Sequence, residues 1–309
     1  MSNIFILNDS ISIGLNKGID VQKEFEKTMS FYTQLRKEPL LDIHKYIVIT
    51  CDVHSLKIGN VPLYKLVNNI TDRDLRIACI SYFFTHENMI DANYCANDID
   101  DATFEEIIKD PNFTNAAIAS IKSWILLSIP ISEEWKDSCI TFGSTSKYKL
   151  RNFYGTNRYD IVNHLLTGTE TQEAYIIRFR HCLDSYTIDF CYNFKDTCLS
   201  MQVEELRNML DHLRKAESRS LIALNREDKN LYRHCKGFNN MFELKSSHNM
   251  GIRFYLKKEN DATLIFGGVG RKSKYKGEKQ NNDIKRSSDE IEKYLKSNRQ
   301  NVDNVSITK

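Results

Sequence analysis

Three short stretches near the end of the chain decide the predicted fold: MFEL over Met241–Leu244, GIRFYL over Gly251–Leu256 and TLIF over Thr263–Phe266. They are rich in the aromatic and branched aliphatic residues that strands favour. Polar turn residues separate them, at Ser246–Asn249 and at Glu259–Asp261. The pattern predicts three consecutive antiparallel strands.

The segments before these strands predict a hairpin and two helices. Tyr175–Phe179 and Tyr186–Phe194 alternate apolar and polar residues as paired strands do, around a turn at 183–185. Leucines at helical spacing then predict one helix over Val203–Leu213 and a second over Leu221–Leu231. Gly237 ends the helical pattern.

The segments after the strands are basic and then helical. A last helix is predicted over about Asp283–Leu295, and Lys296–Lys309 is polar enough to predict a frayed tail. The glycines of Gly267–Gly270 lack the spacing and the Lys-Ser/Thr end of a phosphate-binding loop, so they predict a flexible turn.

The last third of the chain, roughly Val203–Leu295, resembles the RelE/HigB toxin superfamily. The resemblance is carried by Phe242-Glu243-Leu244, Gly251-Ile252-Arg253-Phe254-Tyr255, Leu264-Ile265-Phe266, Gly270-Arg271-Lys272 and Asn282-Asp283-Ile284. It implies a small domain in which two helices pack on a short antiparallel sheet with a terminal helix. Members are typically ribosome-dependent messenger-RNA endonucleases, the related ParE branch poisons gyrase, and other relatives have no known cleavage activity. Two departures are Lys245 in place of the family's usual Arg, and Ser287-Ser288 where the terminal helix commonly has alanine.

Metal-free cleavage of RNA requires a deprotonated 2′-hydroxyl, a stabilised phosphate and a protonated leaving oxygen, which Arg, Lys and Tyr can supply together. Arg253 is the predicted phosphate clamp, and Tyr275 is predicted to stack on a base or relay a proton. The remaining candidate catalytic residues are Arg271, Lys272 and Lys274. The candidate RNA-binding residues are Lys245, Lys257, Lys276, Lys279, Lys285 and Arg286.

Each of these assignments has a structural alternative. Arg253 could pair with a neighbouring carboxylate such as Glu243, and the run Arg271–Lys276 could be a solvated loop. His181, Cys182, Cys191 and Cys198 match no zinc spacing and are predicted to be core residues, and no metal or cofactor is expected. Cys51 with His54, and the acidic Asn97–Asp101, are likewise predicted to be structural.

The first part of the chain predicts a mixed domain of unknown role. The whole chain of 309 residues is long enough for two domains, which are predicted at 1–173 and 174–309. Together they are predicted to be of the α+β class. The predicted elements are a helix over Val21–Arg36, a strand over Tyr46–Val53, a helix capped by Thr71 and running through Tyr82, a helix over Asn112–Leu127 ended by Pro130, a strand over Cys139–Phe142 and a helix over Ile161–Leu166.

Composition points to a cytoplasmic protein. Eight cysteines include no CxxC pair, which favours reduced thiols, and the start of the chain lacks the basic region and apolar core of a signal peptide. Apolar runs such as Trp124–Ile131 are far too short to span a membrane.

Charge is distributed unevenly along the chain. Asp91–Asp110 holds seven acidic residues and one lysine, whereas Arg271–Arg286 holds seven basic residues and two acidic ones. The leading hypothesis is a toxin-like effector of a toxin–antitoxin or abortive-infection system that acts on RNA at the ribosome, with the acidic stretch as an internal antitoxin. The alternative is a non-catalytic RNA- or protein-binding regulator. Expected partners are RNA or the ribosome and an antitoxin or trigger protein, with no membrane or DNA.

Overall fold

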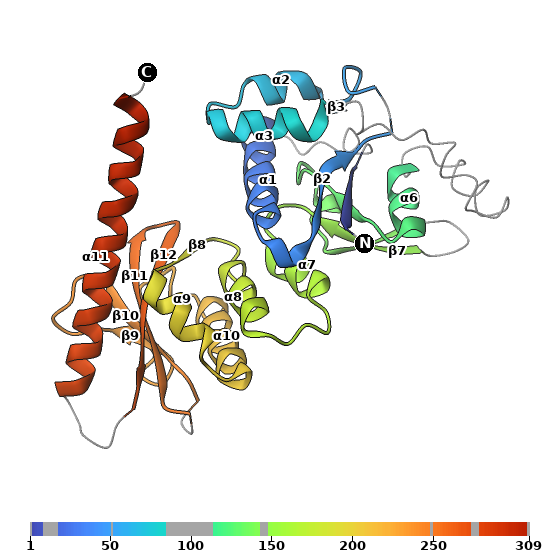
Figure 1. Ribbon diagram of the computed structural model, residues 1–309. Helices are drawn as coiled ribbons and strands as arrows, with labels where there is room; N and C mark the ends of the chain where they lie inside the picture. The colour runs from blue at the N-terminus through green and yellow to red at the C-terminus, as the bar shows by residue number, and fades with distance from the viewer. Residues whose placement is uncertain are drawn as a thin grey trace. The chain divides into compact units, whose positions relative to one another are not determined.

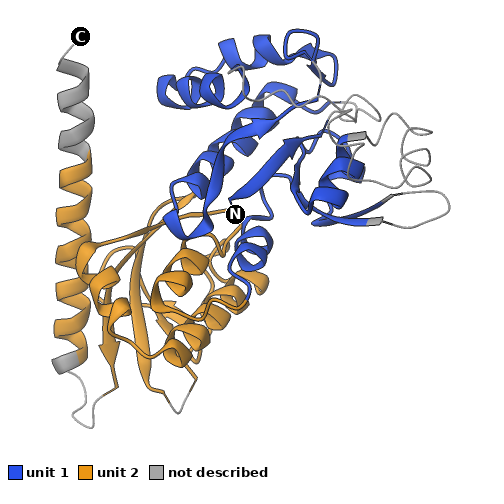
Figure 2. Ribbon diagram, turned by 45° about the vertical axis from the view of Figure 1, so that its right-hand side comes forward, with its two compact units in different colours: residues 1–167 blue, residues 168–309 orange. Residues whose placement is uncertain are grey.

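The computed structural model describes residues 2–8, 18–50, 52–84, 114–142, 148–247, 250–272 and 278–307. The chain divides into two compact units, Met1–Thr167 (unit 1) and Gly168–Lys309 (unit 2), which are coloured separately in Figure 2. Both units combine helices with sheets, so the structure is of the expected mixed α and β class. In the ranges described, no helix has the length and apolarity that crossing a membrane requires.

Unit 1 is built on a mostly parallel five-stranded sheet. Its strands are β1 (Asn3–Leu7), β2 (Ile43–Val48), β5 (Ile125–Leu127), β6 (Cys139–Phe142) and β7 (Tyr148–Phe153). Their order is β2-β1-β5-β7-β6, and only the β6–β7 pair is antiparallel.

Successive residues of β1 face the two sides of this sheet, and each side has its own core. Phe5 meets Tyr32 of α1 (Val21–Arg36) at a ring-centroid distance of 5.1 Å. Ile6 instead belongs to a cluster with Ala116 and Ala119 of α6 (Thr114–Lys122). This alternation places α1 and α6 on opposite faces. The other elements are α2 (Leu63–Asn68), α3 (Arg73–Phe83), α7 (Arg158–Leu165), the hairpin of β3 (Lys57–Ile58) with β4 (Val61–Pro62), and short 3-10 turns at Pro39–Leu41 and Glu133–Trp135.

Several predictions for unit 1 are confirmed. The helix over Val21–Arg36 and the strand over Cys139–Phe142 have the predicted bounds. The helix predicted over Ile161–Leu166 is α7, and β2 overlaps the strand predicted over Tyr46–Val53 only at Tyr46–Val48, since it begins at Ile43 and ends five residues earlier than predicted.

Two predictions for unit 1 are wrong in detail. The predicted helix over Asn112–Leu127 ends at Lys122, because Ser123 adopts a left-handed backbone (φ 55°) and the chain turns into β5. Asp72, not Thr71, caps α3, since its carboxylate accepts from the backbone N–H groups of Asp74 and Leu75.

Unit 2 is built on a second five-stranded sheet. Its strands are β8 (Thr187–Phe190), β9 (Tyr232–His234), β10 (Met241–Lys245), β11 (Ile252–Asn260) and β12 (Thr263–Arg271). The order is β8-β12-β11-β10-β9, antiparallel except for the β12–β8 pair. The predicted meander is confirmed as β10–β11–β12.

Helices cover both faces of this sheet. Figure 1 shows α8 (Gln172–Arg180), α9 (Tyr192–Leu199) and α10 (Val203–Ser218) on one face and the long α11 (Glu278–Ile307) on the other. The first face has an aromatic core in which Phe194 of α9 lies 4.9 Å from Phe254 and 5.2 Å from Phe266, measured between ring centroids.

The hairpin predicted at 175–194 is wrong. Tyr175–Phe179 lies in α8, and only Thr187–Phe190 of the second segment is a strand, after which α9 begins. The helix predicted over Leu221–Leu231 is also wrong, because that segment consists of turns. The terminal helix begins five residues earlier than predicted, and it continues to Ile307 through the segment expected to fray.

The glycines at 267, 268 and 270 lie inside β12 and do not form the predicted flexible turn. They leave no room for a side chain: a Cβ on Gly267 would lie 2.5 Å from the carbonyl oxygen of Ser287, and one on Gly270 would lie 2.9 Å from the Tyr255 ring. A Cβ on Gly268 would overlap the Ser287 hydroxyl. Gly267 and Gly268 therefore let α11 approach the backbone of β12, and Gly270 leaves room for the Tyr255 ring.

We predict that Gly268→Ala lowers the stability of unit 2 by about 1–3 kcal/mol, as overpacking does. Ser287→Ala should cost little alone and should restore much of the loss in the double variant, because it removes the overlapping hydroxyl. Urea unfolding of the four proteins measures this coupling, and strictly additive effects would contradict the proposed close approach.

Candidate functional site

A basic pocket lies on unit 2, with a volume of about 630 Å³. Its position is set by the second half of α10, the turn before β9, the end of β10, the start of β11 and the residue after β12. Among the residues that the structure describes, it is lined by His212, Lys215, Arg219, Asp228, Lys229, Asn230, Leu231, Lys245, Ser246, Ser247, Gly251, Ile252, Arg253 and Lys272. Six Lys or Arg side chains thus share the pocket with one carboxylate, which makes it attractive to anions.

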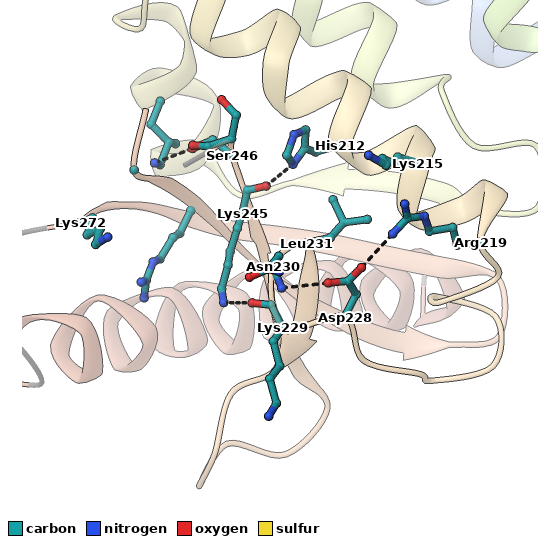
Figure 3. A pocket seen from close by; sticks show the side chains of 14 residues that line it. His212, Lys215, Arg219, Asp228, Lys229, Asn230, Leu231, Lys245, Ser246 and Lys272 are labelled. Atoms are coloured by element: carbon teal, nitrogen blue, oxygen red, sulfur yellow. Dashed lines mark hydrogen bonds and ion pairs between the residues drawn. The ribbon is translucent and has the colours of Figure 1, made fainter. Parts of the chain in front are cut away.

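The wall from α10 is a consequence of helical spacing. His212, Lys215 and Arg219 lie at i, i+3 and i+7, which places them along one side of the helix, while Leu206 and Leu213 are buried. Figure 3 shows Arg219 bonded to Asp228, at 2.8 Å between Nη1 and Oδ2. The only carboxylate of the described lining is therefore already paired with a cation.

A buried carboxylate behind the pocket organises the cations of the sheet. Glu243 of β10 is only 1% exposed, and Arg233, Lys245 and Arg253 all bond or pair with it. The Arg253 Nη1 to Glu243 Oε2 distance is 3.3 Å, and Gln280 of α11 donates to the same oxygen at 2.9 Å. Since a buried charge needs such partners, Glu243 holds these side chains in defined positions.

Lys245 is the most constrained of the pocket lysines. Its ammonium donates to the backbone carbonyl of Lys229 and lies 3.4 Å from Glu243 Oε1. Burial lowers the pKa of Lys245, and the nearby Arg233 and Arg253 act in the same direction while Glu243 opposes them. Lys245 is thus a better proton donor than a solvated lysine.

The structure brings together only some of the residues predicted from sequence. Lys245, Arg253 and Lys272 line the basic pocket together. Arg271 is bound bidentately by Glu205 of α10, with Nη1–Oε1 at 2.6 Å and Nη2–Oε2 at 2.9 Å. This pair lowers the pKa of the Glu205 carboxyl and fixes the end of β12 to the start of α10.

The remaining predicted residues lie elsewhere. Lys257 bonds Glu292 of α11 at 2.6 Å, so it ties β11 to the terminal helix. Arg286 pairs with Asp283 at 3.1 Å, and Lys285 is exposed on the same helix. Lys274, Tyr275 and Lys276, the side chain of Lys279, Cys51, and the acidic segments 91–110 and 97–101 lie outside the described residues.

The structural alternative proposed for Arg253, a pair with Glu243, is present in the structure. Arg253 therefore has two neighbours, the buried carboxylate behind it and the basic pocket in front of it. The predicted core role of His181, Cys182, Cys191 and Cys198 agrees with their burial, since each is at most 2% exposed.

Sequence reasoning missed four basic pocket residues. His212 lies in the helix predicted over Val203–Leu213, and Lys215 and Arg219 follow its predicted end at spacings that continue the same side, so this spacing was the available signal. Lys229 was missed because its segment, Leu221–Leu231, was wrongly predicted to be a helix. Charged residues on a helix face are usually solvated, so their spacing alone does not indicate a site. Here they line a pocket because the turn at 228–231 lies opposite them.

Unit 1 has a buried polar cluster where its parallel strands end. The Asn8 amide donates to Ser128 Oγ at 2.9 Å, and this hydroxyl donates to Asn152 Oδ1 at 2.6 Å. All three side chains are at most 1% exposed. Because the cluster's members bond one another away from solvent, its evident role is to join the ends of β1, β5 and β7.

We predict that Glu243→Gln lowers the stability of unit 2 by about 3 kcal/mol, because it leaves three clustered cations without their buried partner. The matched control is Glu292→Gln, which removes a half-exposed ion pair with Lys257 and should cost at most about 1 kcal/mol. Urea unfolding compares the two variants. Equal losses would show that the Glu243 cluster is no more important than a surface pair.

Comparisons with protein-family models, with curated proteins and with solved structures found no match for the chain. The assignment of a function therefore depends on the chemistry of the basic pocket.

Proposed function

We propose that the chain is a toxin-like effector of a toxin–antitoxin or abortive-infection system, and that it acts on RNA at the ribosome through unit 2. The observation that carries this proposal is the basic pocket, in which six cations face one paired carboxylate. The phosphate backbone of RNA is the polyanion that such a surface attracts, and its ribose and bases offer further contacts.

The size of the pocket favours a nucleotide. Its volume of about 630 Å³ lies within the range of small-molecule sites, so it can hold a nucleotide with its phosphate. Lys245 and Arg253, at the back, are held by Glu243, whereas Lys215, Lys229 and Lys272 are exposed. The fixed cations suit one bound phosphate, and the exposed lysines suit the neighbouring phosphates of a longer strand.

The order of elements supports the RelE/HigB-like part of the proposal. Strand β8 is followed by two helices, α9 and α10, then by the β10–β11–β12 meander and the terminal α11. The meander followed by a terminal helix is what the resemblance over Val203–Leu295 implies. Only one of the two implied helices, α10, lies in that span, since β8 and α9 precede it, and β9 is added at the far edge.

We predict that the full-length protein binds single-stranded RNA with an affinity that falls steeply as salt rises. Lys215→Ala with Lys272→Ala should weaken binding at 0.1 M salt and reduce the slope of log K against log salt by about 1.4, the value for two lost phosphate contacts on a single strand. Fluorescence anisotropy of a labelled RNA at several salt concentrations measures both quantities.

The control removes two exposed charges outside the pocket, by Lys195→Ala and Lys236→Ala, and should leave the slope unchanged. Binding that does not depend on salt would point to a protein partner and support the regulator alternative. The effector role has its own readout: expression of the parent should stop growth and shorten messenger RNA, and the Lys215/Lys272 variant should do neither.

A further inference from the structure

His212 is the one imidazole among the described residues that line the basic pocket. It lies on α10 and is half-buried, and its Nδ1 is 2.5 Å from the backbone carbonyl oxygen of Lys245 (Figure 3). A carbonyl oxygen only accepts, so Nδ1 carries the hydrogen and donates it. In the neutral ring Nε2 is then left with a lone pair.

The surroundings of His212 favour the neutral ring. Burial is the largest influence and lowers the pKa of His212 below 6.5, and the charge of Lys215 lowers it further. The hydrogen bond to the Lys245 carbonyl and the charge of Asp211 act in the opposite direction but less strongly.

We infer that His212 is the general base of unit 2, and that its Nε2 accepts the proton of a ribose 2′-hydroxyl from an RNA strand bound in the basic pocket. This inference rests on the proposed function and deepens it by naming the residue that activates the RNA for cleavage. The catalytic residues predicted from the sequence were Arg253, Arg271, Lys272, Lys274 and Tyr275, and they included no histidine.

The proposed step conserves atoms and charge. As the 2′-hydroxyl proton passes to Nε2, the 2′-oxygen forms a bond to phosphorus and the bond from phosphorus to the 5′-oxygen breaks. The leaving 5′-oxygen takes a proton from the ammonium of Lys245, whose lowered pKa suits it to donate. Arg253 stabilises the charge on the phosphate oxygens, and the products end in a 2′,3′-cyclic phosphate and a 5′-hydroxyl.

The decisive variant is His212→Asn in the full-length protein. The asparagine amide N–H can replace Nδ1 as donor to the Lys245 carbonyl, but no group replaces Nε2. We expect the cleavage rate of a messenger RNA on ribosomes to fall by about 10²–10⁴-fold, the usual contribution of a general base. Binding of an RNA with 2′-deoxyribose at the scissile position should change less than about twofold.

The pH profile separates a catalytic from a structural role. Cleavage by the parent should rise with pH as the imidazolium loses its proton, below pH 6.5, and should fall again at alkaline pH, where the Lys245 ammonium loses its proton. The residual activity of the variant should lack the rise and keep the fall. His164→Asn, a variant in unit 1, serves as the matched control and should keep the parental rate and profile.

The outcomes distinguish this inference from the function on which it rests. A His212→Asn protein that cleaves at the parental rate, or with the parental pH profile, overturns the role of His212 and leaves the proposed function standing. A parent that binds RNA without cleaving it overturns the inference in favour of the non-catalytic regulator. A parent that neither binds nor cleaves RNA overturns both.

Discussion

The buried carboxylate of Glu243 is the constraint on which the basic pocket depends. It holds Arg233 of β9, Lys245 of β10 and Arg253 of β11, and it accepts from Gln280 of α11. Three neighbouring strands and the terminal helix are thereby joined at one charged group. Isolated cations on a strand would be flexible and solvated, whereas these are fixed by a partner that water hardly reaches.

The charges of unit 2 divide into those used by the fold and those that face the pocket. Arg271 and Lys257 are paired with Glu205 and Glu292, and they fix the sheet to α10 and α11. Lys215, Lys229 and Lys272 are exposed at the pocket, so they can exchange water for phosphate oxygens. Lys and Arg residues of unit 2 therefore either stabilise the fold or line the pocket, and only their neighbours in the folded structure show which role each one has.

The sequence predicted elements well where one face of the element is polar. The helix over Val21–Arg36 shows clear periodicity because it contacts solvent on one side. The meander strands, which helices cover on both faces, were predicted instead from their aromatic and branched residues and from the polar turns between them. Prediction failed at Tyr175–Phe179, because every residue of that helical segment is buried and its aromatic and branched residues suggest a strand. Gly267–Gly270 suggested a turn because glycines are common in turns. Their close contact with α11 depends on the folded structure and has no signal in the local sequence.

The candidate site was only partly predictable for a related reason. Lys245, Arg253 and Lys272 could be selected from the meander, since strands next to one another in sequence lie next to one another in the sheet. His212 and Lys215 come from a helix 30 or more residues earlier, and Lys229 comes from a turn whose conformation local sequence did not reveal. A pocket assembled from distant segments has no local signature.

The central claim is that RNA binds in the basic pocket, and photo-crosslinking of the full-length protein to a uridine-rich RNA, read by mass spectrometry, tests it most directly. Crosslinked peptides should cover residues 212–219, 228–231, 245–253 and 272, and excess unlabelled RNA should suppress them. Crosslinks confined to unit 1, or to the face of unit 2 formed by α9, would contradict the claim.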